Sequence, residues 1–507
     1  MNAHRLARNT FYNLIGQGAP MLLALLAFPL LIQHLGTDRF GALTLVWAVI
    51  GYFSLFDLGI SRALIRIVAE RTAAGRDDEV PVFVWTALGL TCALGMAAAL
   101  LLAAVTPWMV TGVLSIPQEL QQETRLALYV LAASLPLVTT SAALKGVLEG
   151  RHHFGVSNAI QVGTGMVTFL GPLAVLPIST SIAAIMVVLV AGRLMAWLAY
   201  FVTSIRLLPA AHRHFAFERR SAAVLLRVGG WMAVSSIIGP IMVYMDRFVI
   251  GSLISLAAVA YYVTPYEVVT KLWLIPGALA AVLYPTFSAA YAQDRERTAR
   301  LFGQGVKYAF ITLFPVTLAF VTLSYEALEL WIGTEFAQNS YRVLQILAVG
   351  VLINSLAQIA YALVQGAGRP DLTAKFHLAE LPFYLAALGW LAHTYGVTGA
   401  ALAWTGRVAV DAGLLFFAAT RLMSAVTAPH LKRLWLLASL AGISIVTGAT
   451  LDNVTAKLGF LGIGLPALLS WCWLRWFSAE ERAVVLGLLS QSKIVQPLFC
   501  KFLRRVS

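Results

Sequence analysis

Charged residues and cysteine are both scarce in this chain. Of its 507 residues only 12% are charged, 60% are hydrophobic and 3 are cysteine. A soluble globular protein carries about twice that share of charge, so the composition excludes one and indicates a polytopic membrane protein. The cysteines, Cys92, Cys472 and Cys500, lie far apart without metal-ligand spacing. We therefore expect no metal site, no cofactor and no disulfide framework.

Long polar stretches are also rare between the apolar runs. About 14 runs have the length of about 20 residues needed to cross roughly 30 Å of hydrocarbon. We therefore expect an all-α, multi-pass membrane protein. The runs lie near residues 11–34, 40–67, 82–105, 126–149, 157–177, 181–205, 229–253, 257–288, 307–326, 343–366, 373–394, 397–420, 433–451 and 457–476.

Lysine and arginine are distributed unevenly between the two ends of these runs. With the N-terminus placed in the cytoplasm, most of the 36 Lys and Arg residues fall at cytoplasmic ends or loops, as the positive-inside rule requires. Both termini are then cytoplasmic. This asymmetry accounts for the formal net charge of +13 without a nucleic-acid partner, and the basic segment 212–220 is interpreted as a topology signal.

The chain contains an internal repeat. LYVLAASLPLVTTSAALKGVLEG at residues 128–150 aligns with LQILAVGVLINSLAQIAYALVQG at residues 344–366. Each repeat holds six predicted helices, so the two should share one topology, be related by a pseudo-two-fold axis along the membrane normal, and bind substrate between them. The expected parts are a six-helix lobe at 1–206, a basic cytoplasmic linker at 207–227, a second lobe at 228–423, two additional helices at 424–478 and an amphipathic cytoplasmic tail at 479–507.

Several ionisable or amide side chains lie inside the predicted spans. A charge at the bilayer centre costs roughly 2.5 to 3.5 kcal/mol, so these residues are expected to face a central cavity. The candidates for substrate binding are Arg193, Arg407, Lys271, Arg247, Asn354 and Gln358, and the candidates for proton or ion coupling are Glu267, Asp411, Asp246 and Glu380. Glu267 with Lys271, and Arg407 with Asp411, are spaced one helical turn apart, so intrahelical pairs that only permit insertion are the alternative.

Arg193 has no acidic residue in its own span, so its partner must come from another helix or from a ligand. The planar guanidinium groups of Arg193 and Arg407 suit bidentate binding of phosphate or carboxylate. Several cations near the middle of the membrane favour a diphosphate over a monovalent acid. The residue pattern thus predicts an anionic group in the cavity.

Four further residues are candidates for gating. Pro20 and Pro240 interrupt the first and seventh predicted spans, where proline frees a backbone carbonyl and permits bending. Asp57 and Arg62 lie near the inner interface of the second span, where their side chains either contribute to a gate or extend toward water.

Five segments together resemble a known family. They are RNTFYNLIGQG at 8–18, HLGTDRFGALTL at 34–45, FDLGISRALIR at 56–66, GVLEGRHHFGVSN at 146–158 and MDRFVIGSLISLAAVAYY at 245–262. In their order and spacing they resemble the polysaccharide flippases of the MOP superfamily, the Wzx-type transporters of O-antigen and exopolysaccharide units. The resemblance covers roughly residues 6–425.

The resemblance implies both an architecture and a substrate. Two six-helix lobes would surround a central cavity that opens alternately to each side, with two extra helices like those of lipid II flippases. The substrate would be an undecaprenyl diphosphate-linked oligosaccharide, moved from the cytoplasmic to the outer leaflet of the inner membrane for polysaccharide or O-antigen biosynthesis. Membrane lipids and polysaccharide polymerase or assembly proteins would be its partners.

Two other function classes remain as alternatives. A MATE-like, cation-coupled exporter of drugs or organic cations would be expected to display unpaired acids, whereas the buried bases here match the buried acids in number. A membrane glycan polymerase or ligase usually has a sizeable outer loop with catalytic groups. The longest predicted outer loop, 106–124, offers only Glu119 and Glu123, so we expect no catalytic residue and no enzyme activity.

Overall fold

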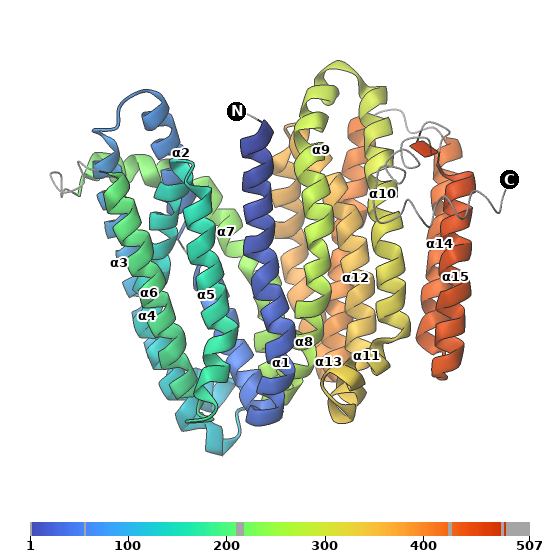
Figure 1. The fold of residues 1–507 in the computed structure, drawn as a ribbon, viewed down its shortest axis with the longest axis horizontal. Helices are drawn as coiled ribbons and strands as arrows, with labels where there is room; N and C mark the ends of the chain where they lie inside the picture. The colour runs from blue at the N-terminus through green and yellow to red at the C-terminus, as the bar shows by residue number, and fades with distance from the viewer. Residues whose placement is uncertain (1–2, 55–56, 209–216, 424–427, 478–480, 483–507) are drawn as a thin grey trace.

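The protein is a bundle of long helices that run side by side (Figure 1). The structure, a computed structural model, describes residues 3–54, 57–208, 217–423, 428–477 and 481–482, and for 3–19, 21, 54, 228–240, 292, 428–438 and 475 it describes the backbone alone. Within these ranges there is no strand. The helices are α1 Ala3–Ser54, α2 Ile60–Ala73, α3 Val80–Trp108, η1 Met109–Val113, α4 Gln118–Gly150, α5 Phe154–Val175, α6 Ile182–Leu207, α7 Arg219–Leu253, α8 Leu256–Thr270, η3 Lys271–Trp273, α9 Leu274–Gln293, α10 Arg295–Thr322, α11 Ser324–Trp331, α12 Thr334–Gly366, α13 Pro370–Met423, α14 Ala428–Thr450 and α15 Val454–Arg475.

These elements confirm the predicted all-α membrane fold. Nine helical segments of the described chain are long and apolar enough to cross a membrane. α1 and α13 each contain two helices that meet at a glycine with positive φ, Gly36 at 78° and Gly396 at 61°. The number of spans and the side of the termini stay predictions. We call the end of the bundle that holds Gly36 the outer end, following the predicted orientation, and the opposite end the inner end.

Both predicted repeats contain an interrupted second helix. In the first, α1 ends at Ser54 and α2 begins at Ile60. In the second, α8 ends at Thr270 and a 3-10 turn precedes α9, which begins at Leu274. Non-helical backbone at membrane depth is tolerated where it is buried in protein or lines a water-filled cavity. The interruptions fall at corresponding positions of the two predicted repeats, which we call the first half and the second half.

The hydrophobic cores show how the two halves are joined. One core combines apolar side chains of α1, α4, α8, α12 and α13 and lies toward the outer end. Toward the inner end the core divides in two. One inner core is formed by α2, α3, α4 and α6 together with Leu225 of α7, and the other by α9, α10, α12 and α13. The described side chains thus give the halves one shared core at the outer end and separate cores at the inner end, where the start of α7 also packs against α2 and α3 of the first half.

Close contacts seal the outer end between the halves. A Cβ added to Gly41 of α1 would lie 1.9 Å from the carbonyl oxygen of Leu256, so the two backbones approach as only glycine allows. The backbone N–H of Ala257 donates to Asp38 Oδ1 at 3.1 Å. The hydroxyl of Ser115 donates to the carbonyl of Ser252 at 2.9 Å. These contacts close the outer end in this conformation.

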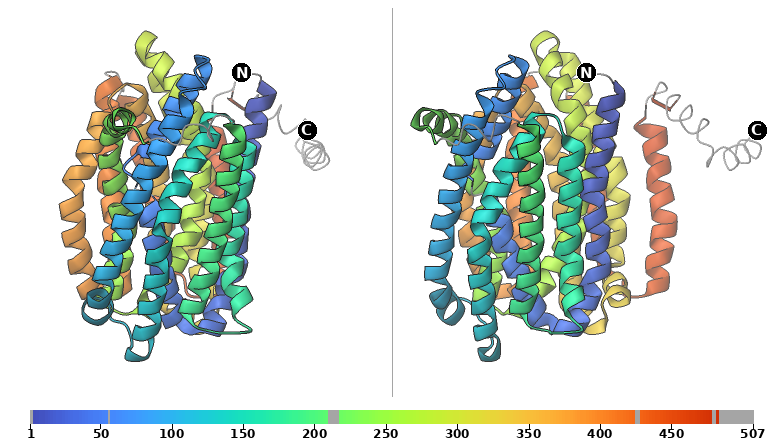
Figure 2. Two further views of the ribbon diagram at one scale, coloured as in Figure 1. Left: turned by 90° about the vertical axis from the view of Figure 1, so that its left-hand side faces the viewer. Right: turned by 60° about the vertical axis from the view of Figure 1, so that its left-hand side comes forward.

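α14 and α15 lie at the edge of the bundle, beside α10 and away from α2–α6 (Figures 1 and 2). An ion pair attaches this helix pair to the second half near each end. At the outer end Lys457 Nζ lies 2.8 Å from Glu326 Oε1. At the inner end Lys307 of α10 pairs with Glu481. The predicted tail at 479–507 otherwise falls outside the described residues, as does 209–216 of the predicted linker.

Candidate functional site

An ionic cluster of one buried and two half-buried side chains lies where α7 meets the interrupted eighth span. Arg247 of α7 is 4% exposed. Its Nη2 lies 3.0 Å from Glu267 Oε1 of α8, and Lys271 Nζ in the 3-10 turn lies 2.9 Å from Glu267 Oε2. The guanidinium carbon of Arg247 also lies 5.1 Å from the ring centroid of Tyr244 and 5.5 Å from that of Tyr266. One carboxylate therefore serves two cations, and two rings cover one of them.

Asp246 is fully buried beside this cluster. The hydroxyl of Tyr262 donates to Asp246 Oδ2 at 2.6 Å, and the backbone N–H of Arg247 donates to Oδ1 at 2.8 Å. Asp246 also interacts electrostatically with Arg407 of α13. The acid of α7 thus links the charges of α8 to those of α13.

α13 contributes a second group of charges. The guanidinium carbon of Arg407 lies 5.5 Å from the ring centroid of Tyr384, and Asp411 Oδ1 lies 3.6 Å from His377 Nε2. Glu380 interacts electrostatically with Arg407, Asp411 and His377. The predicted alternative of an Arg407–Asp411 ion pair is not formed in the described structure, because Asp411 lies closer to His377 in the other half of the α13 hairpin.

Several buried polar atoms of this region have no hydrogen-bond partner among the described residues. They include both carboxylate oxygens of Glu380, Nε of Arg407, the hydroxyls of Tyr266 and Tyr384, and Nε1 of Trp273. A buried polar group without a partner costs roughly 1 to 3 kcal/mol, and more if it is charged. A concentration of such groups within one cluster is typical of a site that is completed by water, an ion or a ligand.

Aromatic rings form one wall of the cluster. Tyr266 lies edge-on to Trp404 with ring centroids 5.5 Å apart, and Trp273 lies 6.3 Å from Trp404. Tyr262 stacks on Tyr266 at 6.0 Å. Trp404 is almost completely buried, so this wall is a packed and rigid surface. The packing of these rings holds the neighbouring charged side chains in place.

Arg193 stands apart from this cluster. It is half-buried on α6 in the first half, and no carboxylate, ring or hydrogen-bond acceptor contacts its guanidinium group among the described residues. Trp197, one turn further along α6, donates to Thr140 Oγ1 of α4 at 2.9 Å. Of the four predicted buried bases, Arg247 and Lys271 share Glu267, whereas Arg193 and Arg407 have no carboxylate at salt-bridge distance in the described chain.

The two amides of α12 pair with each other. Gln358 Nε2 donates to Asn354 Oδ1 at 3.3 Å, one turn apart on the same helix. Both side chains are half-buried. The structure records no contact between this pair and the charged cluster within the described residues.

The four gating candidates have different surroundings. Asp57 is 8% exposed, and its two carboxylate oxygens accept the backbone N–H groups of Gly59 and Ser61, each at 3.0 Å. It therefore caps the first turn of α2. The predicted alternative, in which this side chain extends toward water, is wrong for Asp57. Arg62 is exposed and interacts electrostatically with Tyr361 of α12, across the halves.

The two prolines both lie within helices. A Cβ added to Gly165 of α5 would lie 2.6 Å from the ring of Pro20, so α1 and α5 pack closely at this point. Pro240 lies within α7, where its side chain is outside the described part. The sequence analysis did not predict His377 and Tyr384 as part of the site, because spacing along a chain does not show which helices face each other.

Two solved structures share this fold. An inward-facing multidrug resistance MATE family transporter of the MOP superfamily is 17% identical, with a TM-score of 0.68 over 81% of this chain and 98% of that chain. The lipid II flippase MurJ in an inward closed conformation is 13% identical, with a TM-score of 0.71 over 92% of this chain and 99% of that chain. The fold is that of the membrane transporters of the MOP superfamily.

The sequence comparisons define the family more narrowly. The family model described as polysaccharide biosynthesis protein matches residues 6–291. A protein of Shigella flexneri named for O-antigen transport is 32% identical over 422 residues, which is 82% of this chain and 98% of the relative. The chain belongs to the polysaccharide biosynthesis protein family. The lipopolysaccharide biosynthesis protein WzxC of Escherichia coli K12 is 27% identical over 187 residues, 36% of this chain and 37% of its own length.

Proposed function

We propose that this protein moves an undecaprenyl diphosphate-linked oligosaccharide from the cytoplasmic to the outer leaflet of the inner membrane, for polysaccharide or O-antigen assembly. The observation that carries the proposal is the pair of arginines, Arg193 and Arg407, one in each half, without a carboxylate partner in the described structure. Unpaired guanidinium groups at membrane depth favour a bound phosphate. The relatives named for O-antigen transport and lipopolysaccharide biosynthesis support the same substrate class.

The mechanism that we infer is alternating access. The halves have separate cores toward the inner end and share one core toward the outer end, which is the arrangement of a transporter ready to accept a substrate from the cytoplasm. The diphosphate would bind Arg193, Arg407 and Lys271, while the polyprenyl chain stays in lipid between the halves. Rocking of the halves would then break the outer contacts and expose the sugar outside. The protein acts as a transporter and not as an enzyme, and polysaccharide polymerase or assembly proteins would receive the product.

Coupling to a proton or another ion is assigned to the acids of the second half. Glu380 is the best placed, because both of its buried oxygens lack hydrogen-bond partners in the described part. Asp411 and Asp246 lie in the same network. Glu267 is the least suited, since two cations already hold it.

Complementation tests the proposal. A strain that lacks its polysaccharide flippase would receive the wild-type protein, Arg193→Ala, Arg407→Ala or the double variant, with surface glycan measured against membrane protein level. We expect each single variant to lose at least about tenfold and the double variant to be inactive, in line with loss of charge-assisted hydrogen bonds. Surface glycan at the wild-type level in the double variant would contradict the proposed anion site. Arg193→Lys and Arg407→Lys show whether the bidentate geometry matters.

The unpaired carboxyl of Glu380 also favours a second function, export of an organic cation. Its buried oxygens have no hydrogen bonds among the described residues and could accept a cation in place of the nearby Arg407, and one structural neighbour is a multidrug resistance transporter. Efflux of ethidium from cells that express the protein, with no change in surface glycan, would favour this function over the first.

A further inference from the structure

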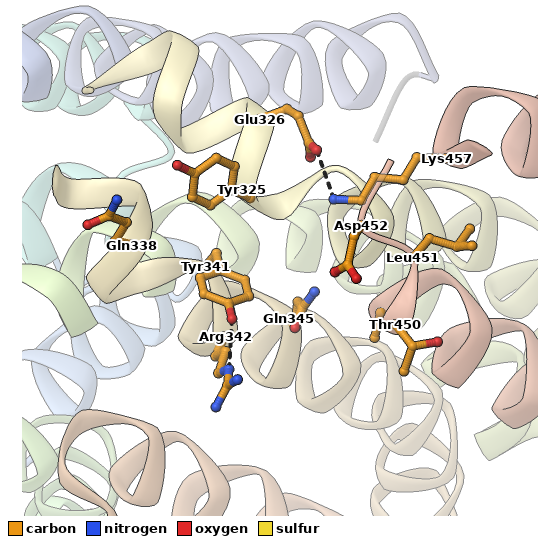
Figure 3. A pocket seen from close by; sticks show the side chains of 11 residues that line it. Tyr325, Glu326, Gln338, Tyr341, Arg342, Gln345, Thr450, Leu451, Asp452 and Lys457 are labelled. Carbon is orange, nitrogen blue, oxygen red and sulfur yellow. Dashed lines mark hydrogen bonds and ion pairs between the residues drawn. The ribbon is translucent and has the colours of Figure 1, made fainter. Parts of the chain in front are cut away.

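A polar cleft of about 640 Å³ opens at the outer end of the bundle. It lies between α11 and the start of α12 on one side and the connection from α14 to α15 on the other, and Figure 3 shows the side chains that line it. Its volume falls within the roughly 300 to 1,000 Å³ typical of small-molecule sites. None of the residues assigned above to the diphosphate lines it.

Charges of both signs line the cleft in equal number. Lys457 is 7% exposed and lies 2.8 Å from Glu326, and these two form part of its wall. Arg342 and Asp452 contribute the second cation and the second anion. The formal charges cancel, so the cleft favours neither a diphosphate nor an organic cation. A neutral ligand rich in hydrogen-bonding groups matches it better.

The uncharged lining supplies the groups that bind hydroxyls. Gln338 and Gln345 each carry a carboxamide, which both donates and accepts hydrogen bonds. Tyr325 and Tyr341 lie edge to face with ring centroids 5.9 Å apart. The second carboxylate oxygen of Glu326 is buried and has no hydrogen-bond partner among the described residues. Carboxamide, carboxylate and aromatic groups together fit a sugar, which presents hydroxyls at its edge and C–H groups on its face.

We propose that this cleft binds a saccharide on the outer side of the membrane. The inference rests on the proposed function, because transport would deliver sugars to this side. Five lining residues, including Asp452 and Lys457, belong to the segment of α14 and α15 that lies outside the internal repeat. The internal repeat does not supply counterparts of α14 and α15 to the first half. The proposed saccharide site therefore lies beside the second half alone. The saccharide comes either from the transported lipid or from free glycan.

A binding measurement on the purified full chain in nanodiscs tests the cleft. The probes are the oligosaccharide released by mild acid from the polyprenyl-linked pool of the complemented strain, and the same oligosaccharide still linked to its lipid. Saturation-transfer NMR and titration would compare the wild type with Gln338→Ala/Asp452→Ala. Both positions are exposed, so the variant should fold. Asn339→Ala is the matched control, because Asn339 is exposed on the same helix and bonds only to the backbone of Glu335.

We expect the double variant to bind about tenfold more weakly than the wild type and the Asn339→Ala control, as the loss of two or more hydrogen bonds implies. Binding of the released oligosaccharide would identify free glycan as a ligand, and binding of the lipid-linked form alone would identify the transported substrate. No binding of either probe by the wild type, or equal binding by the double variant, would overturn the proposal. Normal surface glycan in those cases would leave the proposed transport intact, whereas failure of the wild type to complement would refute the transport itself.

Discussion

Glu380 is buried in α13, and neither of its carboxylate oxygens has a hydrogen-bond partner in the described part of the chain. An ionised carboxylate in that position costs several kcal/mol, so the group should bind a proton or a cation during part of the cycle. Glu380→Gln keeps the shape and removes that exchange. We expect transport to fall by about tenfold or more while the amount of protein in the membrane stays unchanged. A coupling free energy of about 1 to 3 kcal/mol between ion and substrate corresponds to an effect of this size. Surface glycan in complemented cells measures it.

Glu296→Gln is the control for that variant, because Glu296 has an 81% exposed side chain at the start of α10. Equal transport by Glu380→Gln and Glu296→Gln would show that Glu380 has no coupling role. A reduced membrane level of Glu380→Gln alone would instead point to a role in folding, which is why protein level is measured in parallel.

The sequence predicted the site only where one helix carries both partners. Glu267 and Lys271 are one turn apart, and their ion pair is present. Arg407 and Asp411 have the same spacing, yet Asp411 lies nearest His377. Periodicity shows which residues share a face of one helix. It does not show which other helix packs against that face, and the free energy of a buried charge depends on exactly those neighbours.

At the scale of single elements, Asp57 stabilises the start of α2, where the helix resumes after the interruption in the second span. Asp57 accepts the N–H groups of Gly59 and Ser61, which would otherwise be unpaired at membrane depth. Asp57→Ala should lower the free energy of unfolding by about 1 to 2 kcal/mol, the usual worth of an N-terminal cap. Thermal unfolding of the detergent-purified protein measures the loss. Asp78→Ala, in the exposed loop before α3, should leave the midpoint unchanged.

An Asp57→Ala midpoint equal to that of Asp78→Ala would mean that the start of α2 does not need this carboxylate. Asp57→Asn retains an acceptor and should recover part of the lost stability, which separates capping from a requirement for charge.

The helices were largely predictable, and their interruptions were not. Apolar runs of about 20 residues marked the spans because burial in lipid is averaged over a whole helix. A break of a few residues hardly changes that average. In the second span a signal was nevertheless present, since Gly59 is the N-cap residue of α2 and glycine is one of the residue types that favour this position. In the eighth span Pro276 supplied a signal too, because proline lacks the N–H that would bond to the carbonyl of Leu272 in the 3-10 turn.

At the scale of the whole molecule, the outer contacts determine which side is open. Asp38 of the first half accepts the N–H of Ala257 in the second half at 3.1 Å, so a short thiol cross-linker between Asp38→Cys and Ala257→Cys should hold the outer end closed. Transport should stop after cross-linking and return after reduction, because alternating access requires these ends to separate. Surface glycan after a timed pulse measures both steps.

Each single cysteine variant controls for modification alone and should transport normally with the reagent present. Continued transport by the fully cross-linked double variant would contradict a cycle in which the outer ends of the two halves separate. The same measurement on cysteines placed within one half, such as Thr111→Cys with Gln121→Cys, should show no effect of cross-linking.

The composition of the ionic cluster has an electrical consequence. Asp246 and Glu267 carry two formal negative charges, and Arg247 and Lys271 carry two positive ones. Each net charge that crosses a potential of 100 mV contributes roughly 2.3 kcal/mol of work. Because this cluster sums to zero, rocking of the second half displaces no net gating charge through it. Charge movement recorded on supported membranes without substrate should therefore come from Arg407, Asp411 and Glu380 of the same half, whose formal charges sum to −1, and it should grow with the number of phosphates on the lipid that is carried.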